Sequence, residues 1–385
     1  MDSLYRSVKN ALPKHHYLLY GALLKSLFNE PASSNKQFDL LLKNHQKQLT
    51  KKELKEIYNK RVNNYVNLYQ YAAADNALKK EIEIMNSIKD TADFEDLINT
   101  QKIWKALKTV PPQKIYKTKT YNIPLIEDKA GLLNIKVAVN KNILNMVFDT
   151  GANFSTIQRS VAKKIGLKII PSGFSVGTAT SKKIQSDLAI AKRISINDLV
   201  IDNVVFLVVE DESLTFPETD YSINAIIGYP AIKVFEEIQI INNKTLVVPA
   251  KTTNLHYKNF AIDNLTPVVL AYHNSKKLRF HFDTGANNTD LYPLYFKENK
   301  TSIEKSYQLT TSTSGGAGGS EEYKTYELKD FDLKIGGANT RLKSVSLFID
   351  ESFDEKYLHG NLGQDFIKSF KKMVISFKNS YIMFE

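Results

Sequence analysis

The chain contains no cysteine and only one tryptophan among its 385 residues. Without cysteine it has no disulfide framework, no thiol nucleophile and no thiolate ligand for a metal ion. No run of apolar residues approaches the roughly 18 that a membrane-spanning helix requires. Hydrophobic residues at 43% and charged residues at 24% are typical of a globular protein. The length leaves room for two or three domains.

Histidine is also scarce, with seven residues in the whole chain. None of them forms a metal-binding spacing such as HExxH, so we expect neither a metal ion nor another cofactor.

The positive charge is concentrated toward the N-terminus. Residues 1–120 hold 21 Lys and Arg against 12 Asp and Glu, a net charge of +9 out of the +11 of the whole chain. The lysines are scattered and no nucleic-acid motif accompanies them, so we interpret them as a solvated helix surface and expect no nucleic-acid partner. The lysine-rich region and the lack of cysteine favour a bacterial exported or periplasmic protein whose signal peptide is absent from this chain.

Residues 1 to about 108 have the pattern of helices, because apolar positions recur three and four residues apart. Thr50 with Glu53 three residues later predicts a capping box, and Pro31 to Asn35 predicts a break. The stretch 65–82, YVNLYQYAAADNALKKEI, resembles one helix-turn-helix unit of the tetratricopeptide type, and it fits an irregular helical bundle equally well. Pro111 and Pro112 end this region.

After these prolines the pattern changes to short β-rich runs separated by Asn, Gly, Asp and Pro. This alternation indicates a mainly β region with few helices. The expected strands cover 135–139, 144–148, 203–209 and 244–249.

The β region contains an internal repeat. MVFDTGANFS at 146–155 is followed by IIGYPAIKVF at 226–235, and FHFDTGANNT at 280–289 is followed by NLGQDFIKSF at 361–370. The glycine of the later segment lies 79 positions after Asp149 in the first copy and 80 positions after Asp283 in the second. Two halves of nearly equal size therefore present the same landmarks in the same order.

Each copy places an aspartate where an apolar strand ends and a tight turn begins. The glycine of Asp-Thr-Gly lets the chain reverse closely, and the threonine hydroxyl can hold the turn. An aspartate at the end of a buried strand is costly unless it is paired or functional. Its presence in both copies suggests that Asp149 and Asp283 meet about a pseudo-two-fold axis.

Two carboxyl groups about 3 Å apart share one proton and titrate as a unit. Such a pair suits amide hydrolysis, because one member takes a proton from a water while the other donates a proton to the developing oxyanion. The sequence thus predicts a hydrolase of the aspartic endopeptidase type that acts on a peptide or protein substrate.

From about residue 119 to the C-terminus the chain resembles the retropepsin-like aspartic proteases, with both halves fused in one polypeptide. The resemblance implies a mainly β, two-lobed, pseudo-symmetric acid-protease fold, which here is preceded by the α-helical domain that the apolar spacing predicts. It also implies a role for each residue of the repeated motif. Asp149 and Asp283 are the catalytic pair, and Thr150 and Thr284 bond across the interface beneath it. Gly151 and Gly285 shape the turns, and Gly228 and Gly363 lie under them.

Three positions depart from the family's pattern. Asn361 stands where the family has an aliphatic residue, which predicts looser packing below Asp283. Asn153 and Asn287 follow the alanine of the motif, where their amides could bond to the outer oxygen of the aspartates. His281 shares a strand face with Asp283, but the first copy has Val147 there, and we interpret the histidine as peripheral.

Family members close a β-hairpin flap over the substrate, downstream of each aspartate. Residues 176–183 and the glycine-rich stretch 310–324 occupy those places, and the second is not followed by the Lys-Ser/Thr of a phosphate loop. The candidate flap or substrate residues are Gly177, Thr178, Gly315 and Gly316. A surface loop is the alternative interpretation of the glycine-rich stretch.

We expect an α-helical domain at 1–110, a first protease lobe at 111–250 and a second at 251–385. A short link at about 250–258 favours pairing of the two lobes within one chain, and hence a monomer, over pairing between two chains. A non-catalytic peptide-binding or scaffold protein on the same fold is the alternative function.

Overall fold

The computed structural model describes residues 2–88, 94–178, 183–255, 257–353 and 357–385. By their internal contacts these residues form two compact units. The first comprises Met1–Gln113 with the short segments Ser172–Phe174 and Ile262–Leu265, and the second comprises the remainder from Lys114 to Glu385. In the part of the chain described, no helix is long and apolar enough to cross a bilayer.

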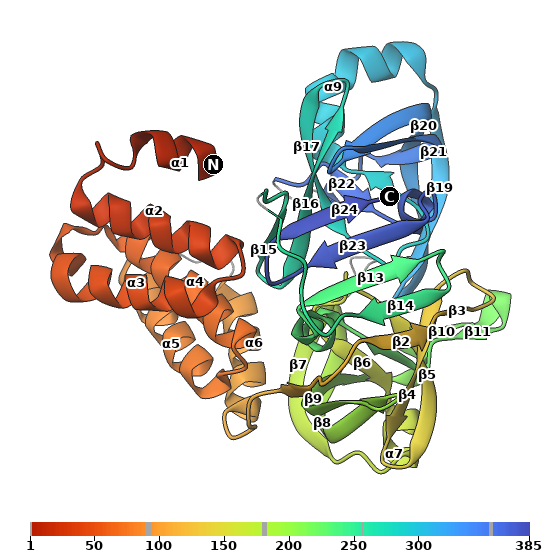
Figure 1. The fold of residues 1–385 in the computed structure, drawn as a ribbon, viewed down its shortest axis with the longest axis horizontal. Helices are drawn as coiled ribbons and strands as arrows, with labels where there is room; N and C mark the ends of the chain where they lie inside the picture. The colour runs from red at the N-terminus through yellow and green to blue at the C-terminus, as the bar shows by residue number, and fades with distance from the viewer. Residues whose placement is uncertain (1, 89–93, 179–182, 256, 354–356) are drawn as a thin grey trace. The chain divides into compact units, whose positions relative to one another are not determined.

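The first unit is helical, as its apolar spacing predicts (Figure 1). Its helices are α1 (Asp2–Val8), α2 (Lys14–Leu27), α3 (Pro31–His45), α4 (Lys51–Asn67), α5 (Tyr71–Ile88) and α6 (Phe94–Leu107), with a 3-10 turn η1 (Gln46–Gln48).

The predicted capping box at Thr50 is confirmed. The Thr50 hydroxyl accepts from the Glu53 N–H at 3.2 Å, and the Glu53 carboxylate accepts from the Thr50 N–H at 2.8 Å. The predicted break at Pro31 to Asn35 is wrong, because these residues form the first turns of α3. Pro31 is the first residue of that helix, where its missing N–H leaves no bond unmade.

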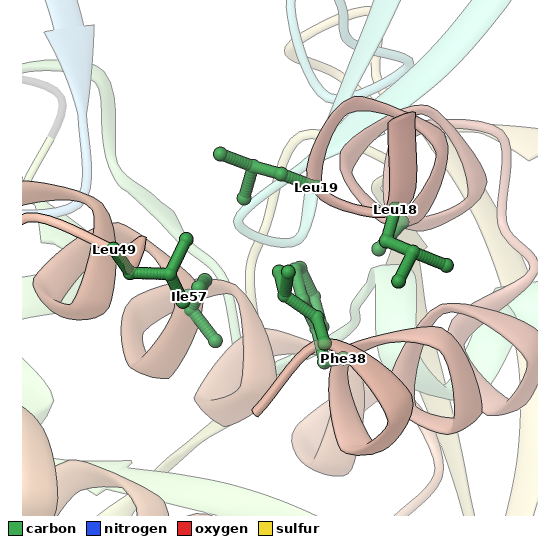
Figure 2. Close-up of a cluster of buried hydrophobic side chains, with 7 residues drawn as sticks. Leu18, Leu19, Phe38, Leu49 and Ile57 are labelled. Carbon is green, nitrogen blue, oxygen red and sulfur yellow. The ribbon is translucent and has the colours of Figure 1, made fainter. Parts of the chain in front are cut away.

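The core between α2, α3 and α4 combines apolar packing with a polar tie. Figure 2 shows side chains from all three helices pointing toward one another, and the buried members of the cluster are Leu18, Leu19, Ala22, Phe38, Leu41, Leu49 and Ile57. Asn64 on α4 is buried, and its amide donates to the Ser34 hydroxyl and to Asn35 Oδ1, at 2.9 Å each. A buried amide bonded in this way orients the helices as well as satisfying its own polar atoms.

The second unit is mainly β, as the alternating runs after Pro112 predict. Its first half contains β1 (Lys114–Tyr116), β2 (Tyr121–Pro124), β3 (Ile126–Glu127), β4 (Leu133–Val139), β5 (Asn142–Phe148), β6 (Ser155–Gln158), α7 (Arg159–Lys164), β7 (Ile169–Gly177), β8 (Lys183–Ile196), β9 (Leu199–Val209), η2 (Asp211–Leu214), β10 (Thr215–Phe216), η3 (Pro217–Thr219), β11 (Tyr221–Ser222), β12 (Ala225–Ile227), α8 (Tyr229–Ile232), η4 (Lys233–Phe235), β13 (Glu237–Ile241) and β14 (Thr245–Val248).

The second half contains β15 (Phe260–Asp263), β16 (Thr266–His273), β17 (Lys276–Phe282), β18 (Asp290–Leu291), α9 (Pro293–Ser306), β19 (Leu309–Gly316), β20 (Gly319–Ile335), β21 (Ala338–Phe348), η5 (Glu351–Phe353), β22 (Gly360–Leu362), α10 (Gln364–Ile367), β23 (Lys372–Ser376) and β24 (Tyr381–Phe384).

Each half closes a ring of strands, and the two rings have the same order. In the first half β9, β6, β12, β5, β4 and β8 are neighbours in that order, and β8 pairs back to β9. In the second half β21, β18, β22, β17, β16 and β20 follow the same order, and β20 pairs both with β21 and with β16. The strand that precedes each aspartate, β5 or β17, runs parallel to the later strand of its own half, β12 or β22.

A separate sheet joins the two halves. Its order is β2, β14, β13, β23 and β24, so strands from the ends of both halves hydrogen-bond directly. Figure 1 shows the green β13 and β14 beside the blue β23 and β24. The register Gln239 to Val374 lies at the centre of the antiparallel pairing between β13 and β23. This shared sheet fixes the two halves to each other within the second unit.

Candidate active site

Asp149 and Asp283 occupy matching places in the two rings. Each follows the last residue of its strand, β5 or β17. The Asp149 N–H donates to the carbonyl of Ile227 at 3.1 Å, and the Asp283 N–H donates to the carbonyl of Leu362, also at 3.1 Å. The parallel neighbour strand therefore holds each aspartate at the point where its own strand turns away.

The turn after each aspartate closes on the aspartate's own carboxylate. The Gly151 N–H donates to Asp149 Oδ1 at 2.7 Å, and the Gly285 N–H donates to Asp283 Oδ1 at the same distance. Asp149 Oδ1 also accepts from the Ala152 N–H at 3.0 Å. These bonds fix the direction in which each carboxyl group points.

The two threonines of the repeat bind across the interface between the halves. Thr150 and Thr284 are both fully buried, and each hydroxyl accepts from the N–H of the other threonine. Each hydroxyl also donates to the carbonyl that precedes the opposite aspartate, Thr150 to Phe282 at 3.1 Å and Thr284 to Phe148 at 2.7 Å. The two turns are thereby locked together by four bonds that connect residues more than 130 positions apart.

The carboxyl groups of the two aspartates meet above this lock. A Cβ on Gly151 would collide with the carboxyl group of Asp283, and a Cβ on Gly285 would collide with that of Asp149. Each glycine therefore lies against the opposite aspartate, and the absence of side chains is what lets the pair approach. Both aspartates are half-buried.

Burial raises the pKa of Asp149 well above its usual range, and the neighbouring negative charge of Asp283 and the hydrogen bond to that carboxyl add to the rise. The backbone N–H groups of Ala152 and Gly151 oppose it, because they stabilise the ionised form. The net effect is that the pair keeps one proton at a pH where isolated aspartates have lost theirs.

The later glycines lie beneath the turns, where the chain is too crowded for a side chain. A Cβ on Gly228 would collide with the carbonyl of Phe154, and a Cβ on Gly363 would collide with that of Asn288. The N–H groups of these glycines donate to Ser155 Oγ and Thr289 Oγ1, each at 3.1 Å.

Asn361 makes a contact that its sequence position did not suggest. Its side chain is buried, and its Nδ2 donates to Asp283 Oδ2 at 3.3 Å. The amide expected to contact this carboxylate, Asn287, instead donates to the carbonyl of Ala130 at 2.6 Å. Asn153 is exposed, and no hydrogen bond from it to Asp149 is seen in the described part of the chain.

The glycine-rich stretch forms a hairpin whose tip reaches the other half of the unit. Gly316 on β19 pairs with Gly319 on β20, and the tip lies between them. Ala317 packs against an apolar cluster beside Asp149 that includes Val147 and Ile226. The Gly318 N–H donates to the carbonyl of Ser213 at 2.9 Å. Gly315 lies on the β19 arm of this hairpin, opposite Ser320.

The other candidate flap is described only in part. Gly177 ends β7 and is exposed, and a Cβ there would meet open space. Thr178 follows it, half-buried. Residues 179–182 of this stretch lie outside the described residues.

Part of the second unit is similar to a known protein family. Residues 135–231 match the model of an aspartyl protease family. Over these residues the chain is similar to aspartyl proteases. The match contains Asp149 and Gly228 and ends before the second copy, and it indicates proteolysis of a peptide substrate in general terms. No curated protein matches the chain at a significant level.

Two parts of the site were missed by sequence reasoning. Asp290 opens β18, the neighbour of β22, and it lies close enough to Asp283 for their charges to interact. Alignment of the two copies would have flagged it, because Thr156 stands at the matching place. The docking of Ala317 had no sequence signal, since it depends on where a long hairpin ends in space.

Proposed function

We propose that the chain is an aspartic endopeptidase in which Asp149 and Asp283 activate one water between them. The observation that carries this proposal is the contact between the two carboxyl groups, each lying against the glycine of the opposite turn. The matching order of strands in the two rings supports a two-lobed, pseudo-symmetric acid-protease fold, with the lobes at 111–250 and 251–385.

The chemistry follows from the single shared proton. The ionised member of the pair accepts a proton from the water, which attacks the scissile carbonyl carbon. The protonated member donates to the carbonyl oxygen as the tetrahedral intermediate forms. Proton transfer to the amide nitrogen then releases the amine, and the pair returns with one proton. The raised pKa of Asp149 supplies the protonated member, and the fixed turns hold both groups in place.

The hairpin of β19 and β20 is proposed as the lid over the substrate. Its tip already bonds to the opposite half at Ser213 and packs beside Asp149. Glycines at and near the tip permit the backbone to open and close. Gly315 and Gly316 are therefore proposed as lid residues, and Gly177 and Thr178 as part of a second lid.

The test measures cleavage of a mixed peptide library by the purified chain between pH 3 and 8. We expect a bell-shaped pH profile with its maximum on the acidic side, unaffected by chelators or thiol reagents. Asp149→Asn and Asp283→Asn should each remove nearly all turnover, while Asp198→Asn, an exposed carboxylate paired with Lys119, should leave it intact. Full activity in either dyad variant would contradict the paired mechanism, and binding of peptides without cleavage would favour a non-catalytic peptide-binding protein.

A further inference from the structure

The two rings differ sharply in a row of three side chains beside the aspartates. In the first ring Ile226 on β12 is paired with Val147 on β5 and with Thr156 on β6. In the second ring the matching position on β22 is Asn361. Residues paired across neighbouring strands lie on one face of the sheet, so each row presents its side chains to the same side.

The first row belongs to an apolar cluster. Val147 and Ile226 are buried in a cluster with Val209 and Leu214, and Ala317 from the hairpin tip packs against it. Polar groups take little part in it, since only the hydroxyl of Thr156 belongs to the row. The Asp149 side of the pair is therefore suited to an apolar side chain of a substrate.

The second row is polar throughout. Asn361 is paired with His281 on β17 and with Asp290 on β18. The Asn361 amide reaches Asp283 Oδ2, which shows that this row lies on the face that carries the dyad. His281 is also two residues before Asp283 on the same strand, and alternation puts both on one face.

The surroundings of this row are acidic. Burial raises the pKa of Asp290 to about 8, and the charges of Asp365 and Asp283 add to the rise. Asp365 is held by the Thr289 N–H and hydroxyl at 3.0 and 2.6 Å, which are neutral donors. Three carboxyl groups thus lie near one another, and they outnumber the one imidazole of the row. A cation placed among them would stabilise the ionised form of Asp290.

We propose that the Asp283 side of the dyad selects a basic side chain, lysine or arginine, next to the scissile bond, while the Asp149 side takes an apolar one. This inference rests on the proposed peptidase function. A lysine or arginine can donate to a carboxyl oxygen of Asp290 and to the Asn361 carbonyl oxygen, whereas an apolar side chain would cover these groups without bonding to them. Because the two rows differ in polarity, the enzyme prefers different side chains on the two sides of the scissile bond.

The experiment first reads the residues that flank each bond cut by the wild-type chain, by mass spectrometry of a peptide library. One flanking position should be rich in Lys and Arg and the other in apolar residues. A matched peptide pair, with lysine or methionine at the basic position, then gives the ratio of kcat/KM values. Asp290→Asn should lower the lysine-to-methionine ratio at least tenfold.

Two further variants complete the test. The combined substitution His281→Val, Asp290→Thr and Asn361→Ile copies the first row into the second, and it should move the preference toward methionine. Asp330→Asn, an exposed carboxylate on β20, should leave the ratio unchanged. Cleavage between apolar residues on both sides, or an unchanged ratio in Asp290→Asn, would overturn this inference alone. If the wild-type chain cuts no peptide, the proposed function itself fails.

Discussion

The hydroxyl of Thr150 accepts from the Thr284 N–H at 3.1 Å, and the hydroxyl of Thr284 accepts from the Thr150 N–H at 3.0 Å. Because both residues are fully buried, any group that loses its partner here cannot turn to water instead. The reciprocal bonds therefore join the halves energetically as well as aligning the two aspartates.

Thr150→Val tests this lock. The substitution keeps the shape of the side chain but leaves the Thr284 N–H and the Phe282 carbonyl without a partner. At about 1–3 kcal/mol for each buried group, we expect the free energy of unfolding to fall by about 2–6 kcal/mol, measured by urea denaturation. Thr150→Ser keeps the hydroxyl and should cost less than half as much. The double variant with Thr284→Val removes all four bonds, whereas each single variant removes two of them, so it should cost more than either single variant.

The repeat predicted from the sequence that Asp149 and Asp283 meet, because both copies carry the same three residues after an apolar strand, whereas the bonding of Thr150 to Thr284 was implied by the family resemblance. The capping box at Thr50 was equally predictable, since it depends on residues only three apart. A contact between residues so close in sequence depends on the local backbone conformation and not on the tertiary fold, so the sequence alone can predict it.

Contacts that depend on distant parts of the chain were not predictable in the same way. Asn361 was expected to weaken packing, and nothing in the sequence indicated that β22 would bring its amide to Asp283, 78 residues earlier. Pro31 was read as a break, although proline serves equally well as the first residue of a helix. In both cases one residue type is compatible with two environments, and only the tertiary packing decides between them.

Gly228 offers a purely steric test of the space beneath the first turn. Its φ of −94° suits any residue, so the cost of a side chain comes only from collision with the carbonyls of Phe154 and Ala152. Gly228→Ala should lower the free energy of unfolding by about 1–3 kcal/mol, and it should reduce kcat by displacing the turn that holds Asp149. Gly177→Ala is the matched control, because a Cβ there meets open space, and its melting temperature should stay within about one degree of wild type.

The raised pKa of Asp149 predicts how stability depends on pH. In the unfolded chain this carboxyl ionises near pH 3.9, whereas the folded protein keeps it protonated to higher pH. At pH values between the unfolded and the folded pKa of Asp149, folding therefore takes up a proton. The contribution of Asp149 to stability is lost as the pH rises through the folded pKa. Asp149→Asn cannot ionise, so its melting temperature should match wild type near pH 3.5 and exceed it at pH 7.5. Equal melting temperatures at both pH values would show that the pair carries no extra proton.

The raised pKa of Glu81 predicts a similar pH dependence of stability for the helical unit. It is almost fully buried and accepts from Asn59 Nδ2 at 3.0 Å. Burial raises its pKa to about 7, although Asn59 and the nearby Lys55 and Lys60 lower it in part. The stability that protonated Glu81 provides is full below about pH 4.3 and is lost as the pH rises through 7.

Glu81→Gln should therefore leave the free energy of unfolding unchanged near pH 4 and raise it by up to about 3 kcal/mol at pH 8. Glu83→Gln removes an exposed carboxylate from the same helix, and its effect should stay small at both pH values. If Glu81→Gln and Glu83→Gln change the free energy of unfolding equally at both pH values, the Glu81 carboxylate is hydrated and this prediction is wrong.

A substitution at Ala317 tests whether the β19–β20 hairpin works as a lid. Its methyl group packs against the apolar cluster beside Asp149, so Ala317→Asp would place a charge where no partner can satisfy it and would detach the tip. If the docked tip closes the site around substrate, kcat/KM should fall about tenfold or more, while the melting temperature changes little because the hairpin stem is intact. Thr311→Asp puts the same charge on the exposed stem opposite Lys324, and it should leave kcat/KM near the wild-type value. A rise in kcat/KM for Ala317→Asp would instead show that the docked tip occupies the place of the substrate.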